Sequence, residues 1–270
     1  MSVVRDIAAV NRVLDDDPVA ACMVAARVAD HGVDPRTMGG ELWTRRRPLD
    51  SLCFAGANLI PLRGAPGDLE AFADQALGSA RRCSSLVGHA GLVLPMWERL
   101  SRGWGPARDV RDEQPLLALN SRPFCGPDPG VRRVRADELD AYLIAAVDMF
   151  IGEVGIDPRT GDGGRGYRRR VAALIGAGRA YARFEQGRVV FKAEIGSQSP
   201  SVGQIQGVWV HPEWRGHGLG TAGTAAVAAS VVDGGRTASL YVNNYNTVAR
   251  AAYARVGFRQ VGTFATVLLD

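Results

Sequence analysis

The chain has 270 residues and a mass of 28.8 kDa, long enough for one large domain or two compact ones. Its 46% apolar and 22% charged residues are typical of soluble globular proteins and exclude disordered and fibrous classes. No segment approaches 18 uninterrupted apolar residues, and the N-terminus, with Arg5, Asp6 and Arg12, lacks the regions of a signal peptide. We therefore expect a cytoplasmic protein with no membrane partner.

The net charge of +4 is unevenly distributed along the chain. Residues 1–130 contain 15 basic and 16 acidic side chains, whereas residues 131–270 contain 17 and 12, so the second part is the better candidate for an anionic ligand. No basic tract interleaved with aromatic residues appears, so we expect no nucleic-acid partner. The four cysteines fit neither a zinc motif nor a dense disulfide framework, which predicts free buried thiols and no metal.

A stretch rich in proline and glycine, SRPFCGPDPG at 121–130, predicts a boundary between domains at 1–122 and 131–270. In the first domain the apolar spacing predicts, in chain order, a helix over 18–29, a strand-compatible run over 49–62, a helix over 68–77, short strands at 86–87 and 92–94, and a helix face formed by Trp97, Leu100 and Trp104. This mixture is typical of an α/β or α+β domain.

The second domain has clearer patterns. In chain order they predict a helix over 139–150, a helix over 167–175, a hairpin of strands 179–184 and 189–195, a strand over 202–211, a helix over 219–232, a strand over 238–242, a helix over 247–255, and a strand pair within 258–268. Gln186 and Gly187 form the hairpin turn, and Gly257 closes the last helix. Gly207, inside the third strand, fits a β-bulge.

The densest chemical signal is VWVHPEWRGHGLGT, residues 208–221, between a predicted strand and a predicted helix. Its glycines, Gly216, Gly218 and Gly220, allow the backbone to turn successive N–H groups inward, and the helix N-terminus adds its dipole. Arg215 supplies positive charge. The segment therefore predicts a site for phosphate oxygens.

A dinucleotide-binding loop competes for the same residues, because 218–223 also satisfies G-x-G-x-x-G. That loop needs a tight turn directly from strand into glycine, but the seven residues 211–217 intervene. It also needs an acidic residue about 20 positions further on, whereas Asp270 is the next carboxylate after Asp233. Both requirements fail.

The segment HPEWRGHGLG resembles the coenzyme A pyrophosphate loop of the GNAT acetyltransferases, whose pattern Arg/Gln-x-x-Gly-x-Gly/Ala is filled by Arg215, Gly218 and Gly220. A second segment, residues 240–258, resembles the fifth strand and fourth helix of that family. Its matching residues are Asn246, Ala249, Tyr253, Gly257 and Phe258. The resemblance covers 131–270, and the whole chain is similar to a group of actinobacterial proteins that place an uncharacterised domain before a GNAT domain.

This resemblance implies an α/β (α+β) protein whose C-terminal half has the GNAT fold, with a mixed, mostly antiparallel sheet. A smaller α/β domain of unknown role, either a degenerate GNAT-like unit or a stabilising partner, would precede it. The implied activity is acetyl-CoA-dependent transfer of acetyl to the primary amine of a small molecule or protein, by direct attack on the thioester. Residues implied in binding acetyl-CoA, the co-substrate, are Val208, Trp209, Val210, Arg215, Gly216, His217, Gly218, Leu219, Gly220, Thr221 and Asn246.

Tyr253 is the candidate catalytic residue. It shares a helix face with Asn246, and a phenol of pKa about 10 can protonate a departing thiolate; alternatively it is a packed core aromatic. In many GNAT relatives a glutamate on the fourth strand acts as the general base, but Gln204 and Gln206 occupy that stretch here, and a glutamine cannot act as a base.

The general base therefore stays open among three side chains, Glu153, Glu194 and His211, and a water molecule; each of the three could instead be structural. A catalytically idle acyl-CoA sensor would also retain the loop. Residues 1–120 lack the loop, so we expect no coenzyme A there. Residues 39–43 and 54–62 could wall an acceptor pocket between the domains.

Overall fold

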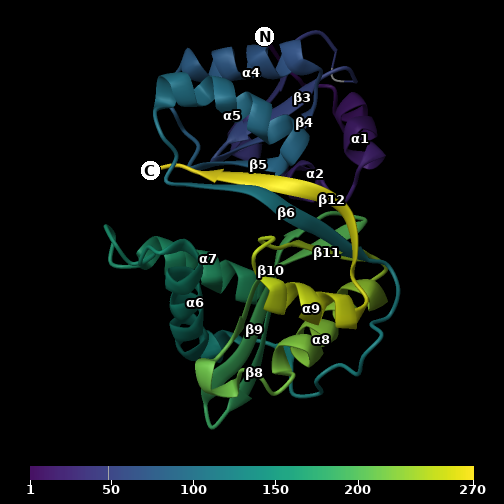
Figure 1. Ribbon diagram of the computed structural model, residues 1–270, viewed down its shortest axis with the longest axis vertical. Helices are drawn as coiled ribbons and strands as arrows, with labels where there is room; N and C mark the ends of the chain where they lie inside the picture. Colours follow the sequence, from purple (N-terminus) through teal and green to yellow (C-terminus); the bar gives the residue numbers. More distant parts are fainter. Residues whose placement is uncertain (48) are drawn as a thin grey trace.

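The computed structural model describes residues 1–47 and 49–270, whose strands form one twelve-stranded sheet with helices on both faces (Figure 1). The strands are β1 (Ser2–Val3), β2 (Gly40–Thr44), β3 (Leu52–Gly56), β4 (Asn58–Arg63), β5 (Ser85–His89), β6 (Asp109–Leu119), β7 (Arg132–Arg133), β8 (Ala180–Glu185), β9 (Arg188–Gln198), β10 (Val202–Val210), β11 (Thr237–Tyr241) and β12 (Arg259–Leu268). The α-helices are α1 (Ile7–Asp16), α2 (Cys22–His31), α3 (Pro35–Met38), α4 (Pro66–Leu77), α5 (Ala90–Trp104), α6 (Leu139–Val154), α7 (Arg165–Gly176), α8 (Leu219–Asp233) and α9 (Thr247–Val256), with short 3₁₀ turns η1 (Ala136–Glu138) and η2 (Pro212–Trp214).

The two parts of the chain follow the same element order. Each contains a short strand, two or more helices, three consecutive strands, a helix, a strand, a helix and a last strand. The strand order is β1-β2-β3-β4-β5-β12-β6-β11-β10-β9-β8-β7, which reads the same from both edges once β7 to β12 are matched with β1 to β6. Of the two alternatives for the first part, the one with the same arrangement as the second part is thus present, with a largely antiparallel sheet.

The last strand of each part is exchanged. β12 pairs with β5 of the first part, β6 pairs with β11 of the second, and β6 and β12 pair with each other at the centre (Figure 1). Phe264 of β12 consequently lies in one apolar cluster with Phe54 and Val24 of the first part. The sheet is therefore continuous across the predicted boundary between residues 122 and 131.

The only parallel pairs among the described strands occur at equivalent places in the two parts. β10 and β11 pair from Val202 to Gln204 and then separate, and β4 and β5 pair only at Asn58 and Leu59. In β10 the register against β9 shifts between Gln206 and Trp209, and Gly207 has φ = 59°. The predicted bulge is confirmed, and it lies where β10 leaves β11.

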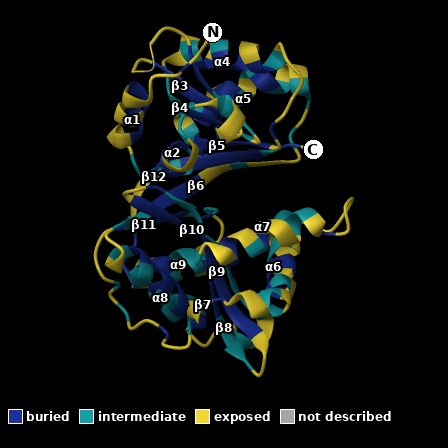
Figure 2. Ribbon diagram, turned by 180° about the vertical axis from the view of Figure 1, so that it is seen from behind, coloured by how far each residue is buried: buried dark blue, intermediate teal, exposed yellow. Residues whose placement is uncertain are grey.

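Helices cover both faces of the sheet, and buried residues follow the strands (Figure 2). α4 and α5 cover one face of the first part, and α8 and α9 cover one face of the second. The turn at Gln186 and Gly187 has φ values of 50° and 78°, which suits a tight hairpin, and all four cysteines are free. In the described part of the chain, no helix is both long and apolar enough to cross a membrane.

Two predicted elements were wrong, and the elements α1, α3, β1, β2, β6 and β7 were not predicted. Residues 92–94 belong to α5, because Val93, Met96 and Leu100 form one buried helical face. Residues 258–268 form the single strand β12 rather than a strand pair, since β5 and β6 flank it on both sides. The sequence analysis also missed β6, whose first five residues, DVRDE, show no apolar alternation.

Candidate functional site

A cavity of about 720 Å³ opens where β10 and β11 separate. This volume lies in the usual range for small-molecule sites. Its walls come from both parts of the chain. The second part contributes Ile205 to Trp209 of β10, Leu240 to Asn243 at the end of β11, Asp148, Met149, Gly152, Glu153 and Val154 of α6, and Thr266 and Leu268 of β12. The first part contributes Arg111 and Gln114 of β6 together with Met23, Asn58, Ser85 and Val87. The exchanged strands thus contribute directly to the cavity.

The glycine-rich segment follows the bulged strand and leads into α8. Gly216 and Gly218 both have φ = 79°, a left-handed conformation that suits glycine, and Gly218 is the N-cap of α8. A Cβ on Gly220 would lie 3.5 Å from Val210 Cγ2, so this turn packs closely on β10. The first N–H groups of α8 have no partner within the helix and carry its positive dipole end. This geometry suits an anionic group.

Arg215 stands between the segment and the cavity. Its Nε donates to the carbonyl oxygen of Val210 at 3.1 Å, and its other guanidinium N–H groups make no hydrogen bond within residues 1–47 and 49–270. His211 N–H donates to Val190 of β9 at 2.9 Å, and ladder N–H groups alternate in direction. The N–H and carbonyl of Val210 therefore face away from β9, toward the gap that β11 leaves.

Five of the residues implied in coenzyme A binding or catalysis line this one cavity: Val208, Trp209, Arg215, Asn246 and Tyr253. Val210 and the loop residues Gly216, His217, Gly218, Leu219, Gly220 and Thr221 do not line it; they adjoin Arg215. Asn246 has a structural role as well, because its Oδ1 accepts from Ala249 N–H at 3.1 Å as the N-cap of α9. The binding roles stay predictions.

Tyr253 lies on α9 and is 8% exposed. Its ring packs edge to face on Phe258, and its hydroxyl has no hydrogen-bond partner in the described part of the chain. Burial, together with the charge of Glu153, raises the pKa of Tyr253, so the phenol keeps its proton at neutral pH. A protonated hydroxyl that faces a cavity without a partner can donate to a ligand.

The chain's single lysine is the functional candidate that the sequence analysis missed. Lys192 is fully buried under the bulge; its Nζ donates to Glu194 Oε1 at 2.9 Å and to the carbonyl oxygen of Gly207 at 3.2 Å. Glu194 also accepts from Tyr142 at 3.3 Å. The signal was present as two charges, two positions apart, in the otherwise apolar strand VVFKAEI. The Lys192–Glu194 pair therefore holds the carbonyl group of Gly207 in the bulge from the buried side of the strand.

The candidate bases occupy different places. Burial alone would raise the pKa of Glu194, but the charges of Lys192 and Arg170 outweigh it and hold that pKa below its usual value. The carboxylate is thus already paired away from the cavity. His211 does not line the cavity either: its Nδ1 accepts from Glu213 N–H at 3.3 Å, and its Nε2 lies 2.9 Å from Arg188. Of the three side chains, only Glu153 lines the cavity.

Glu153 lies in the last turn of α6, with Asp148 nearby in the same cavity wall. Arg111 of β6 donates to the carbonyl oxygen of Glu153 at 2.9 Å and approaches its carboxylate at 4.0 Å. Of the segments 39–43 and 54–62, which were predicted to wall an acceptor pocket, one residue lines this cavity. Asn58 lines the cavity, whereas Glu41 and Trp43 face a different one.

Two family models match parts of the chain. Residues 40–142 match a domain of unknown function, DUF4081, and residues 192–267 match the model described as FR47-like protein. A search of curated protein sequences finds no significant match.

Solved structures match the chain over its length. A Drosophila protein is 15% identical with a TM-score of 0.69, covering 98% of this chain and 97% of that one. A GNAT-family acetyltransferase from Colwellia psychrerythraea is 11% identical with a TM-score of 0.59 and covers 100% and 99%. A GCN5-related N-acetyltransferase from Kribbella flavida is 15% identical with a TM-score of 0.56 and covers 92% and 96%. The chain therefore has the two-part GNAT fold.

Proposed function

We propose that the protein is an acetyl-CoA-dependent N-acetyltransferase that transfers acetyl directly to a primary amine. The observation that carries the proposal is the cavity between β10 and β11, which Arg215 and Tyr253 both line. The GNAT fold supports the same class of activity. A splayed parallel pair leaves unpaired strand backbone to which an extended ligand can hydrogen-bond.

The chain's own groups divide the work between binding and chemistry. Arg215, which lines the cavity, and the N-terminus of α8, which lies beyond Arg215 along the same loop, bind the pyrophosphate, since both present donors and positive charge. The N–H of Val210 faces the gap and stabilises the charge that develops on the thioester oxygen. Tyr253 donates its proton to the departing thiolate, a role that requires the free hydroxyl described above.

Glu153 is the base in this proposal. Acetyl-CoA supplies the activated acyl group, and the acceptor enters from the side that Asp148 and Glu153 line. Two carboxylates at this wall attract a cationic amine, and Glu153 then removes the ammonium proton, directly or through one water molecule. The acceptor therefore carries a primary amine on a body small enough to pass between the two parts of the chain.

The decisive experiment measures amine-dependent release of free thiol from acetyl-CoA, with a panel of small amines and peptides. We expect turnover with at least one acceptor, and Glu153→Gln should lower kcat/KM while it leaves acetyl-CoA binding intact. In calorimetry, Arg215→Ala should weaken coenzyme A binding roughly 10- to 100-fold, because it removes charge-assisted hydrogen bonds to phosphate. Tight coenzyme A binding without turnover on any acceptor would contradict the enzymatic proposal and favour the sensor.

A further inference from the structure

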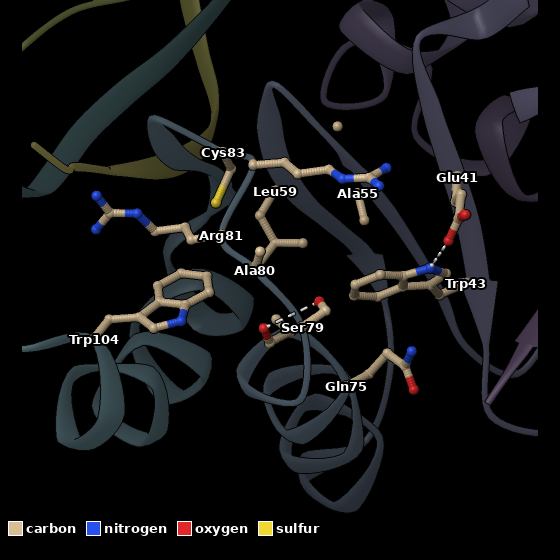
Figure 3. Close-up of a pocket in the computed structure, with 13 residues that line it drawn as sticks. Glu41, Trp43, Ala55, Leu59, Gln75, Ser79, Ala80, Arg81, Cys83 and Trp104 are labelled. Atoms are coloured by element: carbon tan, nitrogen blue, oxygen red, sulfur yellow. Dashed lines mark hydrogen bonds between the residues drawn. The ribbon is translucent and has the colours of Figure 1, made fainter. Parts of the chain in front are cut away.

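A second cavity, of about 220 Å³, lies in the first part of the chain, on the sheet face that α4 and α5 cover (Figure 3). It is separate from the cavity between β10 and β11. Leu59 lines this cavity, whereas its neighbour Asn58 lines the other one, because successive strand residues point to opposite faces. Nothing in the proposed acetyl transfer uses this second cavity.

Two tryptophans stand on opposite sides of the cavity, with Leu59 and Cys83 between them (Figure 3). Trp43 is 8% exposed, and its Nε1 donates to Glu41 Oε2 at 2.8 Å, which fixes the plane of the indole. Trp104, at the end of α5, has an indole N–H without a partner in the described part of the chain. Burial raises the pKa of Cys83, so its thiol stays neutral and adds no charge to the wall of the cavity. The interior suits a flat apolar group.

Positive charge lies at the rim of the cavity. Arg81 is already engaged, since its guanidinium donates to the carbonyl oxygen of Asp270 and points away from Trp43 (Figure 3). Arg82 is exposed, lines the cavity, and forms no hydrogen bond or ion pair with any residue of 1–47 or 49–270. Gln75 adds an amide that is equally without a partner there. The rim can therefore bind one anionic group.

The corresponding strand and helix of the second part are bridged by a core side chain. Tyr181 of β8 takes the place of Trp43 of β2, and its hydroxyl lies 2.8 Å from that of Ser230 on α8. Tyr181 thus bridges strand and helix inside the core, whereas α4 presents Ala76, with Ser79 and Ala80 just beyond its end. The two parts of the chain therefore differ here: small side chains of the first part leave a cavity, whereas Tyr181 packs between strand and helix in the second.

We propose that this cavity binds a small aromatic carboxylate, with the ring between Trp43 and Trp104 and the carboxylate on Arg82. Aromatic rings pack well against indole faces, and a guanidinium binds a carboxylate in a planar fork. The volume is below the range of sites for drug-sized ligands, so the ligand is a single ring system with a short acidic chain.

The test uses the full chain and indole-3-acetate as probe, with two matched compounds: indole-3-acetamide, which lacks the charge, and cyclohexylacetate, which lacks the aromatic ring. We expect calorimetry to give a Kd below about 1 mM for indole-3-acetate and at least tenfold weaker binding of both analogues. Arg82→Ala should weaken binding roughly 10- to 100-fold. Arg122→Ala, an exposed arginine far along the chain in the linker, should leave binding unchanged.

The five tryptophans locate the bound probe. In a ¹H–¹⁵N spectrum, assigned with single Trp→Phe variants, the indole signals of Trp43 and Trp104 should shift on addition of indole-3-acetate. Those of Trp97, Trp209 and Trp214 should stay in place. Shifts confined to Trp209, which lines the cavity between β10 and β11, equal binding of the three compounds, or undiminished binding by Arg82→Ala would each overturn the proposal. None of these outcomes bears on acetyl transfer.

Discussion

At the scale of single residues, Tyr253 gives the sharpest test of the chemistry. Tyr253→Phe removes one hydroxyl and keeps the ring volume. Because that hydroxyl has no partner in the described part of the chain, the variant leaves no buried group unpaired and should keep the wild-type Tm. The kcat should fall by about 10²- to 10⁴-fold, the usual span for a positioned general acid. Steady-state kinetics and thermal unfolding on one sample of the variant distinguish a catalytic role from a structural one. A near-wild-type kcat would show that Tyr253 is not the general acid.

Lys192 and Glu194 are predicted to depend on each other. Lys192→Met leaves Arg170, 3.6 Å away and half-exposed, as the cation beside the buried Glu194 carboxylate, so the loss of the buried partner should cost at most about 3 to 5 kcal/mol of unfolding free energy. Adding Glu194→Gln removes this poorly compensated charge and should recover most of that loss. Denaturant unfolding of the two single variants and the double variant measures the coupling. If the double variant were no more stable than Lys192→Met, the pair would not be the unit that supports the bulge.

Some candidate site residues can be singled out from the sequence and others cannot. Arg215 and the loop glycines stand out because they form a local run of residues, although their binding roles stay predictions, and the bulge at Gly207 was predicted because a glycine lies inside a strand pattern. Lys192 was missed because its role depends on register: it lies opposite Trp209 only once β9 and β10 pair. The register between two strands cannot be predicted from the sequence of either strand alone.

At the scale of elements, the bulge in β10 can be tested at Gly207. A Cβ there would lie 3.0 Å from Lys192 Nζ and 3.2 Å from Met149 Cε, in a residue with φ = 59°. Gly207→Ala should therefore lose about 1 to 2 kcal/mol of stability and also weaken coenzyme A binding, since the strand must shift. Gly176→Ala is the matched control, because a Cβ there meets nothing within 4 Å. Equal effects of the two substitutions in unfolding and calorimetry would argue against the bulge's role.

The first part of the chain carries a pH-sensitive contact at the end of β5. His89 Nε2, at the end of β5, lies 2.8 Å from Asp17 Oδ2. The hydrogen bond raises the pKa of His89 above 6.5 and lowers that of Asp17 below 3.8. The contribution of His89 to the stability of the fold is complete below pH 6.5 and is lost as the pH rises through its pKa in the folded state. The contribution of Asp17 to stability is present above pH 3.8 and is lost as the pH falls through its lowered pKa.

The pair should therefore stabilise the fold most between these two values. Both side chains are partly exposed, so the expected contribution is only about 0.5 kcal/mol. The Tm difference between wild type and Asp17→Asn should be larger at about pH 5 than at about pH 8.5. The amide retains the oxygen that accepts from Ala20 N–H, so this hydrogen bond in the turn between α1 and α2 is preserved. A Tm difference independent of pH, or one shared by Asp15→Asn, would contradict the assignment.

At the scale of the whole molecule, the exchanged strands predict that neither part folds alone. A fragment of residues 1–122 lacks β12 and leaves β5 without its neighbour, and a fragment of residues 123–270 lacks β6 beside β11. We expect each fragment to be unfolded or aggregated by circular dichroism and gel filtration. Coexpression should give a soluble complex of the two, and the intact chain should unfold in one cooperative transition. A stable monomeric fragment would contradict this prediction.

The overall architecture was only partly accessible from the sequence. The order of helices and strands in residues 131–270 followed from apolar periodicity and from turn residues such as Gly187 and Gly257. The exchange of β6 and β12 did not, because the charged start of β6 hides its alternation and its partners lie far away along the chain. The cavity between β10 and β11, whose walls come from both parts of the chain, was hidden for the same reason.

The position of β12 also constrains when the protein can fold during its synthesis. Phe264 is made long after the first part of the chain and pairs with His89 and Gln114, so the central strands of the first part wait for β12 to leave the ribosome. Loop closure over such sequence distances is slow, and unpaired strand edges promote aggregation in the meantime. Nascent chains of the first part therefore present β5 and β6 as open edges, which makes them natural clients for chaperones that bind exposed strands.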